Sequence, residues 1–155
     1  METFLRETIQ QYLLNPWYVT GFVDGEGTFT FSRSGNHMTL CFGLKLTAQD
    51  RSALELIREF FKGIGQIYHV KAYSSHKGKT KAAAYFRVTR INDLLKIVDH
   101  FDNYPLKSTK NKQFKIWREM VMIKYNNFRR KHLDELEILA KKLSALSPRN
   151  QVWHD

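Results

Sequence analysis

Asp24 and Glu26 are the two acids of the segment Asp-Gly-Glu-Gly. Asn15-Pro16 provides an N-cap and a proline at the first helical position, which predicts a short helix over residues 17–24. Both carboxylates then stand at its C-terminal end, where the macrodipole disfavours negative charge. A divalent cation such as Mg²⁺ would compensate them, because it takes oxygen ligands, and Glu26 with the Gly25 carbonyl could supply two. A glycine-rich turn with solvated acids is the alternative interpretation.

The same predicted helix carries two glycines four residues apart, Gly21 and Gly25. They lie on one helical face and allow another backbone to approach closely. Only one such helix occurs in the chain, so a second copy of the chain is one partner for this face. The rest of its own domain is the other, and spacing alone favours neither.

The charge of the chain favours a polyanionic partner. Its 155 residues include 25 Lys and Arg against 15 Asp and Glu, a net charge of +10. Residues 27–49 and 62–90 contain no acid, and residues 105–131 contain nine basic residues and only Glu119 as acid. A solvated surface would mix both signs, whereas basic strands without acids are typical of a nucleic-acid platform.

Composition excludes several other classes of protein. The single cysteine, Cys41, excludes an intrachain disulfide framework and a cysteine-rich zinc site. No run approaches the ~18 apolar residues of a transmembrane helix, and the N-terminus lacks the layout of a signal peptide. We therefore expect a soluble, intracellular chain with no membrane partner and no small-molecule substrate.

The elements that must position these residues alternate between helices and β-hairpins, which predicts an α+β fold with an antiparallel sheet covered by helices on one face. The expected helices span residues 4–13, 17–24, 50–61, 91–102, 110–127 and 132–146. The expected strands span residues 28–34, 38–47, 65–73 and 82–90, with a basic loop joining the last two. Residues 148–155 are expected to form a tail.

Strand alternation assigns side chains to the uncovered face of the sheet. The third strand is ambiguous, because parity selects Gln66, Tyr68 and Val70 whereas polarity selects His69 and Lys71; a bulge could reconcile the two. The residues expected to contact nucleic acid are Thr28, Thr30, Ser32, Lys45, Tyr68, Lys71, Lys77, Lys79, Lys81, Tyr85, Arg87, Thr89, Lys107 and Lys112.

Residues 17–27, Trp-Tyr-Val-Thr-Gly-Phe-Val-Asp-Gly-Glu-Gly, resemble the signature of the LAGLIDADG homing endonucleases. Residues 42–65 and 104–113 are similar to further segments of that family, and the likeness covers about residues 8–120. It implies an αββαββα saddle with a four-stranded antiparallel sheet, helices on the convex face and additional C-terminal helices. Residues 1–147 would form one domain.

The resemblance also implies roles for individual residues. Glu26 matches the family's metal-binding acid, with Gly25 supplying a carbonyl, and Lys110 matches the lysine that contacts the active-site solvent. Ala48 stands where a glutamine is common, and Gln49 follows it, so either Gln49 takes that catalytic role or the role is vacant. The motif helices of two copies would pack together, with the interface formed by Trp17, Thr20, Gly21, Asp24 and Gly25.

The implied function is site-specific hydrolysis of both strands of double-stranded DNA by a homodimer on a long, pseudo-palindromic site. The implied metal is Mg²⁺ or Mn²⁺, with Ca²⁺ as a substitute that does not support cleavage. An RNA-binding intron maturase and a non-catalytic DNA-binding regulator on the same scaffold are the alternatives. If the gene lies in an organellar intron, a chloroplast or mitochondrial location is expected.

Overall fold

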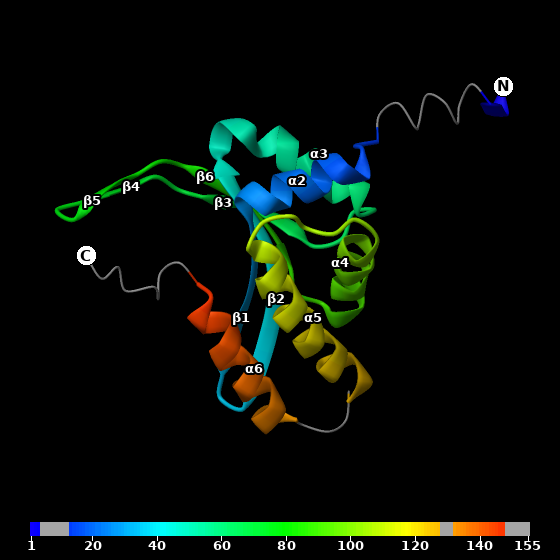
Figure 1. Cartoon of the computed structure of the whole chain (residues 1–155). Helices are drawn as coiled ribbons and strands as arrows, with labels where there is room; N and C mark the ends of the chain where they lie inside the picture. The colour runs from blue at the N-terminus through cyan, green and yellow to red at the C-terminus, as the bar shows by residue number, and fades with distance from the viewer. Residues whose placement is uncertain (4–12, 128–131, 148–155) are drawn as a thin grey trace.

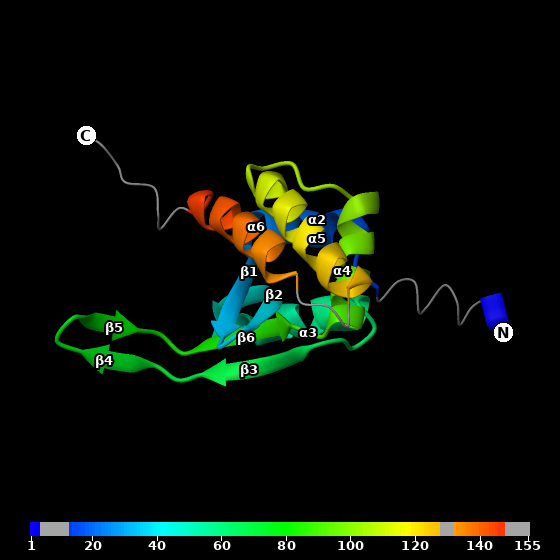
Figure 2. The ribbon, with the colours of Figure 1, turned by 90° about the horizontal axis from the view of Figure 1, so that it is seen from below.

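A four-stranded antiparallel sheet with helices packed against it forms the centre of the molecule (Figure 1). The computed structural model describes residues 1–3, 13–127 and 132–147. The strand order is β1-β2-β6-β3, and a separate two-stranded ribbon, β4-β5, projects beyond the sheet (Figure 2). The α+β fold expected from the alternating hairpins is therefore confirmed.

The described elements follow the expected order. The helices are α2 (Pro16–Glu26), α3 (Arg51–Phe60), α4 (Ile91–Asn103), α5 (Lys110–Asn126) and α6 (Leu133–Ala145), with a 3₁₀ turn at Ala48–Asp50. The strands are β1 (Gly27–Ser34), β2 (His37–Thr47), β3 (Gln66–Val70), β4 (Tyr73–Ser75), β5 (Gly78–Thr80) and β6 (Ala83–Val88). No helix in these described stretches is long and apolar enough to cross a membrane.

Three expectations need revision or lie outside this description. The motif helix continues through Glu26 instead of ending near Asp24, because its last residues keep their helical backbone until Gly27. The expected basic loop is a short antiparallel hairpin, in which Tyr73 pairs with Thr80. The expected helix 4–13 and the tail 148–155 fall almost entirely on residues outside the described ranges.

The register of β3 resolves which of its side chains face outward. Gln66 pairs with Arg87 and Tyr68 with Tyr85, so parity holds and no bulge interrupts the strand between Gln66 and Val70. His69 pairs with Ala84 instead, on the parity of the covered face. Of the two alternatives left open for this strand, the register therefore follows parity, although the His69 side chain is exposed.

The core lies between the inner face of the sheet and the helices. Phe29 is in ring contact with Phe42, Phe101, Phe114 and Trp117, at centroid distances of 5.1–5.7 Å. Trp117 is fully buried, and its Nε1 donates to the Thr30 carbonyl at 3.2 Å. This packing fixes α5 against β1, which places the first residues of α5 near the end of α2.

Candidate functional site

The motif helix α2 divides into stripes that face different surroundings. Val19 and Val23 are completely buried. Tyr18, Gly21, Phe22 and Gly25, spaced i, i+3, i+4 and i+7, form an accessible stripe that we call the open face. A Cβ atom built on either glycine meets no atom within 4 Å, so the described part of the domain does not cover this face at Gly21 and Gly25. Phe22, between them, is partly buried against the core.

Two residues expected at the interface between copies point into their own domain instead. Thr20 is 2% exposed; its Oγ1 donates to the Tyr104 carbonyl at 2.8 Å and lies 3.1 Å from His100 Nε2. Asp24 accepts hydrogen bonds from the backbone of the loop before α5. Both side chains therefore already have polar partners in the same chain, and their place in an interface between copies stays a prediction. Trp17 is half exposed and meets Tyr104 edge-on at 5.3 Å.

The carboxylate of Asp24 holds the start of α5. It accepts hydrogen bonds from Lys107 N at 2.9 Å, from Ser108 N at 3.1 Å and from Ser108 Oγ at 2.7 Å. Partial burial raises the pKa of Asp24, but these hydrogen bonds and the charge of Lys110 outweigh it and keep the pKa below its ordinary value. Asp24 is therefore an ionised structural clamp.

Lys110 is the cation beside this clamp. Its Nζ donates to the Val23 carbonyl at 3.0 Å, so the lysine also bonds the last turn of α2. Burial of the ammonium lowers the pKa of Lys110, while the charges of Asp24 and Glu26 oppose this shift. The motif helix thus fixes both the backbone that precedes Lys110 and the end of its side chain.

Glu26 is exposed at a groove of about 700 Å³ that lies between the sheet and the ends of α5 and α6. Lys110, Lys45 and Tyr85 line the same groove, as do Thr28 and Thr30. The structure therefore brings the expected metal-binding acid and the expected lysine together. Gly27 follows directly, and a Cβ there would sit 2.4 Å from Val23 Cγ1, so only glycine allows β1 to leave the helix at this angle.

One chain supplies few ligands for a metal ion. In the described ranges, no group of three His, Cys, Asp or Glu side chains is placed to hold one. Glu26 offers one carboxylate, and Asp24 is occupied by the start of α5. Of the two motif acids, Glu26 is therefore the one left accessible to a divalent cation.

Gln49 is not brought to this groove. It lies in the 3₁₀ turn and is exposed, and it does not line the groove that Glu26 and Lys110 share. The backbone N–H of Ala48 is bonded to the Ala82 carbonyl at 2.9 Å.

The outer face of the sheet forms two rows of paired residues. One row runs Thr28, Gly43, Arg87 and Gln66 across the four strands, and the next runs Lys45, Tyr85 and Tyr68. A second groove, of about 550 Å³, extends over this face and includes Ser32, Thr89 and Tyr68. Most of the strand residues expected to contact nucleic acid therefore share one surface.

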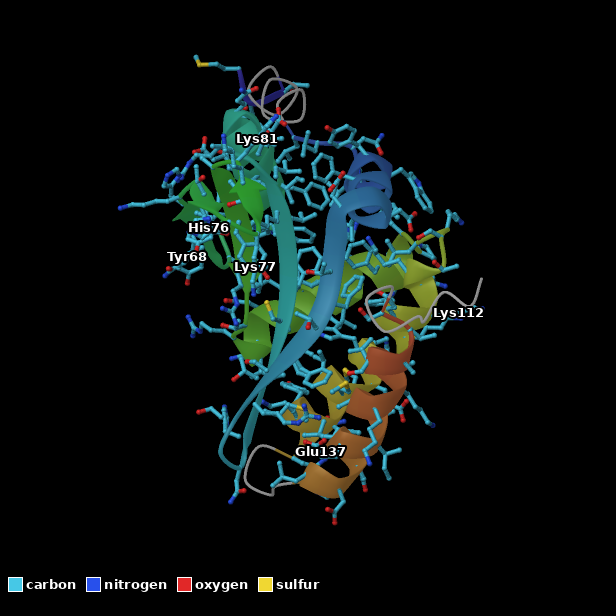
Figure 3. All side chains as sticks on the ribbon, turned by 90° about the vertical axis from the view of Figure 1, so that its left-hand side faces the viewer. Tyr68, His76, Lys77, Lys81, Lys112 and Glu137 are labelled. Carbon is cyan, nitrogen blue, oxygen red and sulfur yellow. The ribbon has the colours of Figure 1, made fainter. Side chains whose placement is uncertain are left out.

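Lysines extend this surface along the ribbon. Lys77 lies in the turn between β4 and β5, on the side of the molecule that faces the viewer in Figure 3, whereas Lys112 belongs to α5. Lys71, Lys79, Lys81 and Lys107 are exposed, and Lys107 Nζ stands 5.3 Å from the Trp17 ring centroid. Lys107 and Lys112 therefore belong to the surroundings of α5 instead of the ribbon.

Sequence reasoning did not assign the aromatic residues of the open face or the inward contacts of Thr20. The spacing of Tyr18 and Phe22 relative to the two glycines was the available signal for the aromatic residues. No local signal identifies the contacts of Thr20, because its partners are 80 and 84 residues away.

Comparison with known proteins agrees with this arrangement. A family model described as LAGLIDADG endonuclease matches residues 19–121. Over 119 residues the chain is 35% identical to an uncharacterized 50.9 kDa protein in ND4 intron 1 of Podospora anserina, covering 71% of this chain and 24% of that protein. The chain spans about a quarter of the length of the curated relatives it matches.

Two solved structures share the fold. The LAGLIDADG meganuclease I-AabMI bound to uncleaved DNA is 28% identical with a TM-score of 0.70, over 84% of this chain and 45% of that one. The homing endonuclease I-TnaI is 24% identical with a TM-score of 0.66, over 90% of this chain and 99% of that one, and this likeness concerns the fold alone.

Proposed function

Because this chain belongs to the LAGLIDADG endonuclease family, we propose that it is a metal-dependent endonuclease that cuts both strands of double-stranded DNA at a specific site. The observation that carries the proposal is the pairing of Glu26 and Lys110 in one groove beneath a basic sheet. An exposed carboxylate facing a polyanion is unfavourable unless a cation lies between them. In a catalytic site, a bound metal ion is that cation, and it would offset the repulsion between the Glu26 carboxylate and the DNA phosphates.

The proposed active form is a homodimer. At Gly21 and Gly25 the open face of α2 has no neighbour within 4 Å in the described part of the chain, and these glycines leave space for a second backbone. Packing α2 against α2 of a second copy would bring two Glu26 carboxylates near one axis. The second carboxylate supplies what the single chain lacks for holding a cation, and two copies give a pseudo-palindromic DNA site.

Glu26 and the Gly25 carbonyl are the groups that would hold Mg²⁺ or Mn²⁺. The ion, when bound, would activate water and stabilise the leaving oxygen of the phosphodiester. Lys110 would stabilise negative charge that develops on the phosphate, since its ammonium is held at a fixed place by the Val23 carbonyl. Asp24 acts through Lys107 and Ser108 and is a positioning residue.

DNA would lie along the outer face of the sheet. The two rows of strand side chains would face the bases, and a two-stranded ribbon of this kind fits a major groove. Lys77, Lys79 and Lys81 on the ribbon would contact phosphates farther along the duplex. The relative encoded in an intron supports an intron origin for this gene as well, and we expect the protein to act inside the cell or an organelle that holds such an intron.

The test compares the parent protein with Glu26→Gln on DNA sites selected from a random library, with and without Mg²⁺. We expect the parent to cut, and Glu26→Gln to bind with similar affinity but not cut. Glu59→Gln, an exposed glutamate on α3, is the matched control and should cut like the parent. Binding without cutting by the parent would instead indicate a regulator, and preference for intron RNA would indicate a maturase.

A further inference from the structure

Three residues of the outer sheet face form a bonded cluster. Arg87 Nε donates to Cys41 Sγ at 3.3 Å, and the same sulfur lies 4.0 Å from Tyr85 Oη. The thiol hydrogen of Cys41 is directed to the Phe42 carbonyl at 3.5 Å, which leaves the sulfur lone pairs for Arg87. Cys41 is 2% exposed, so the sulfur is an internal support of the surface and does not itself face a ligand.

Gly43 makes this cluster possible. It stands between Thr28 and Arg87 in its row, directly beside Tyr85. A Cβ atom on Gly43 would lie 2.7 Å from both Cε2 and Oη of the Tyr85 ring. The tyrosine ring therefore lies across the glycine, which brings its hydroxyl toward Cys41 and packs one side of the space beside Arg87.

The hydrogen bond to sulfur fixes how Arg87 is presented. With Nε engaged, the guanidinium plane is held, and the two terminal nitrogens remain for an external ligand. Arg87 lines the second groove together with Ser32, Gln66 and Tyr68. Asp93 lines that groove too, but no ion pair joins it to Arg87 among the described residues. The cation is thus held in place without its charge being neutralised by a described carboxylate.

We propose that Arg87 recognises one guanine in each half of the DNA site with its two terminal nitrogens, and that the Cys41 thiol positions it for this contact. The inference rests on the proposed function, since it names the base that the sheet face would read. Guanine is the base whose major-groove edge offers two adjacent acceptors, O6 and N7, which match an arginine end-on. A lysine or a mobile arginine would contact phosphates equally well, but a held guanidinium plane favours a planar, bidentate partner.

The test measures base preference at every position by selection of bound sites from a random DNA library. The parent should select guanine at one position in each half-site. Arg87→Ala should lose that preference, with discrimination falling on the order of 10- to 100-fold, and should leave the other positions unchanged. Lys79→Ala, on the ribbon, is the control and should weaken binding uniformly with a smaller salt dependence.

Two variants separate positioning by sulfur from simple packing. Cys41→Ser keeps an acceptor and should retain the guanine preference. Cys41→Val fills similar space without an acceptor and should lose about tenfold of the discrimination at that position only. Thermal melting of each variant confirms folding.

Retention of the guanine preference in Arg87→Ala would overturn the assignment of the base, and an unchanged profile in Cys41→Val would overturn the role of sulfur. If the parent selects no sequence at all, the proposed function fails together with this inference. A parent that selects and cuts a site whose profile is unaffected by Arg87→Ala refutes the inference alone.

Discussion

The stability of the protein should depend on pH through one buried histidine, His100. It is 7% exposed and lies among aromatic rings, at 4.7 Å from Phe101 and 5.3 Å from Phe60 between centroids. Thr20 Oγ1 donates its hydrogen to the Tyr104 carbonyl, so it accepts from His100 Nε2. His100 therefore carries a hydrogen on Nε2, and through this bond it anchors the motif helix.

Burial lowers the pKa of His100 from 6.5 to about 4, against a smaller opposing effect of Asp99. The folded state thus binds fewer protons than the unfolded state between these values, and stability falls as the pH falls through this window. At still lower pH, below the folded pKa, this loss is complete. Between about pH 7 and about pH 5, the two pKa values give a loss of about 2 kcal/mol in the free energy of unfolding.

Urea unfolding at several pH values, followed by far-UV circular dichroism, measures this loss. His100→Leu removes the titrating group, so its unfolding free energy should fall by about 2 kcal/mol less than that of the parent over the same interval. Asn92→Ala, on the same helix and exposed, controls for general destabilisation and should keep the pH dependence of the parent. If the free energy of unfolding falls with pH equally in the parent and in His100→Leu, the assignment of this pH dependence to His100 is refuted.

Two further predictions concern the motif helix. Gly21→Leu should leave the chain folded, because a Cβ there meets no atom within 4 Å, but it should prevent formation of the proposed dimer. Sedimentation of the parent and the variant on DNA tests this prediction. An unchanged dimer would contradict the role of the open face. Asp24→Asn should destabilise the fold by about 2 kcal/mol, because amide hydrogens would face the N–H donors of Lys107 and Ser108. It should also slow any Lys110-dependent cleavage, whereas unchanged urea midpoints would argue against the clamp.

Much of the fold follows from local patterns in the sequence. Strict alternation in residues 28–34 is sufficient to place Phe29 inside and Thr28 and Thr30 outside, because a period of two leaves only two assignments and burial of phenylalanine selects one. The same logic applies to β3, where Gln66 and Tyr68 face outward as parity requires. The polarity of His69 was misleading, since its position opposite Ala84 is set by the neighbouring strand.

The candidate site is less predictable because its residues gain their roles from distant partners. The glycine spacing marks one face of α2 but does not say which neighbouring side chains share that face. Thr20 faces inward, where it bonds the Tyr104 carbonyl and His100. Asp24 accepts hydrogen bonds from the N–H groups of Lys107 and Ser108, in the loop before α5. From the sequence alone, Cys41 is interpreted as a small strand residue. Its contacts with Arg87 and Tyr85 depend on the strand register, which the sequence does not show.

The two acids of the motif illustrate how one helix separates two tasks. Residues two positions apart are turned by about 200° around a helix, so Asp24 and Glu26 cannot face the same surroundings. Asp24 accepts hydrogen bonds from Lys107 and Ser108, in the loop before α5, and thereby places Lys110, while Glu26 lines the groove and keeps its carboxylate accessible. The charge of Asp24 is neutralised within the fold, whereas that of Glu26 is left for a ligand. For this reason Asp24→Asn should lower stability and Glu26→Gln should not, and the reverse pattern would show that the two roles are exchanged.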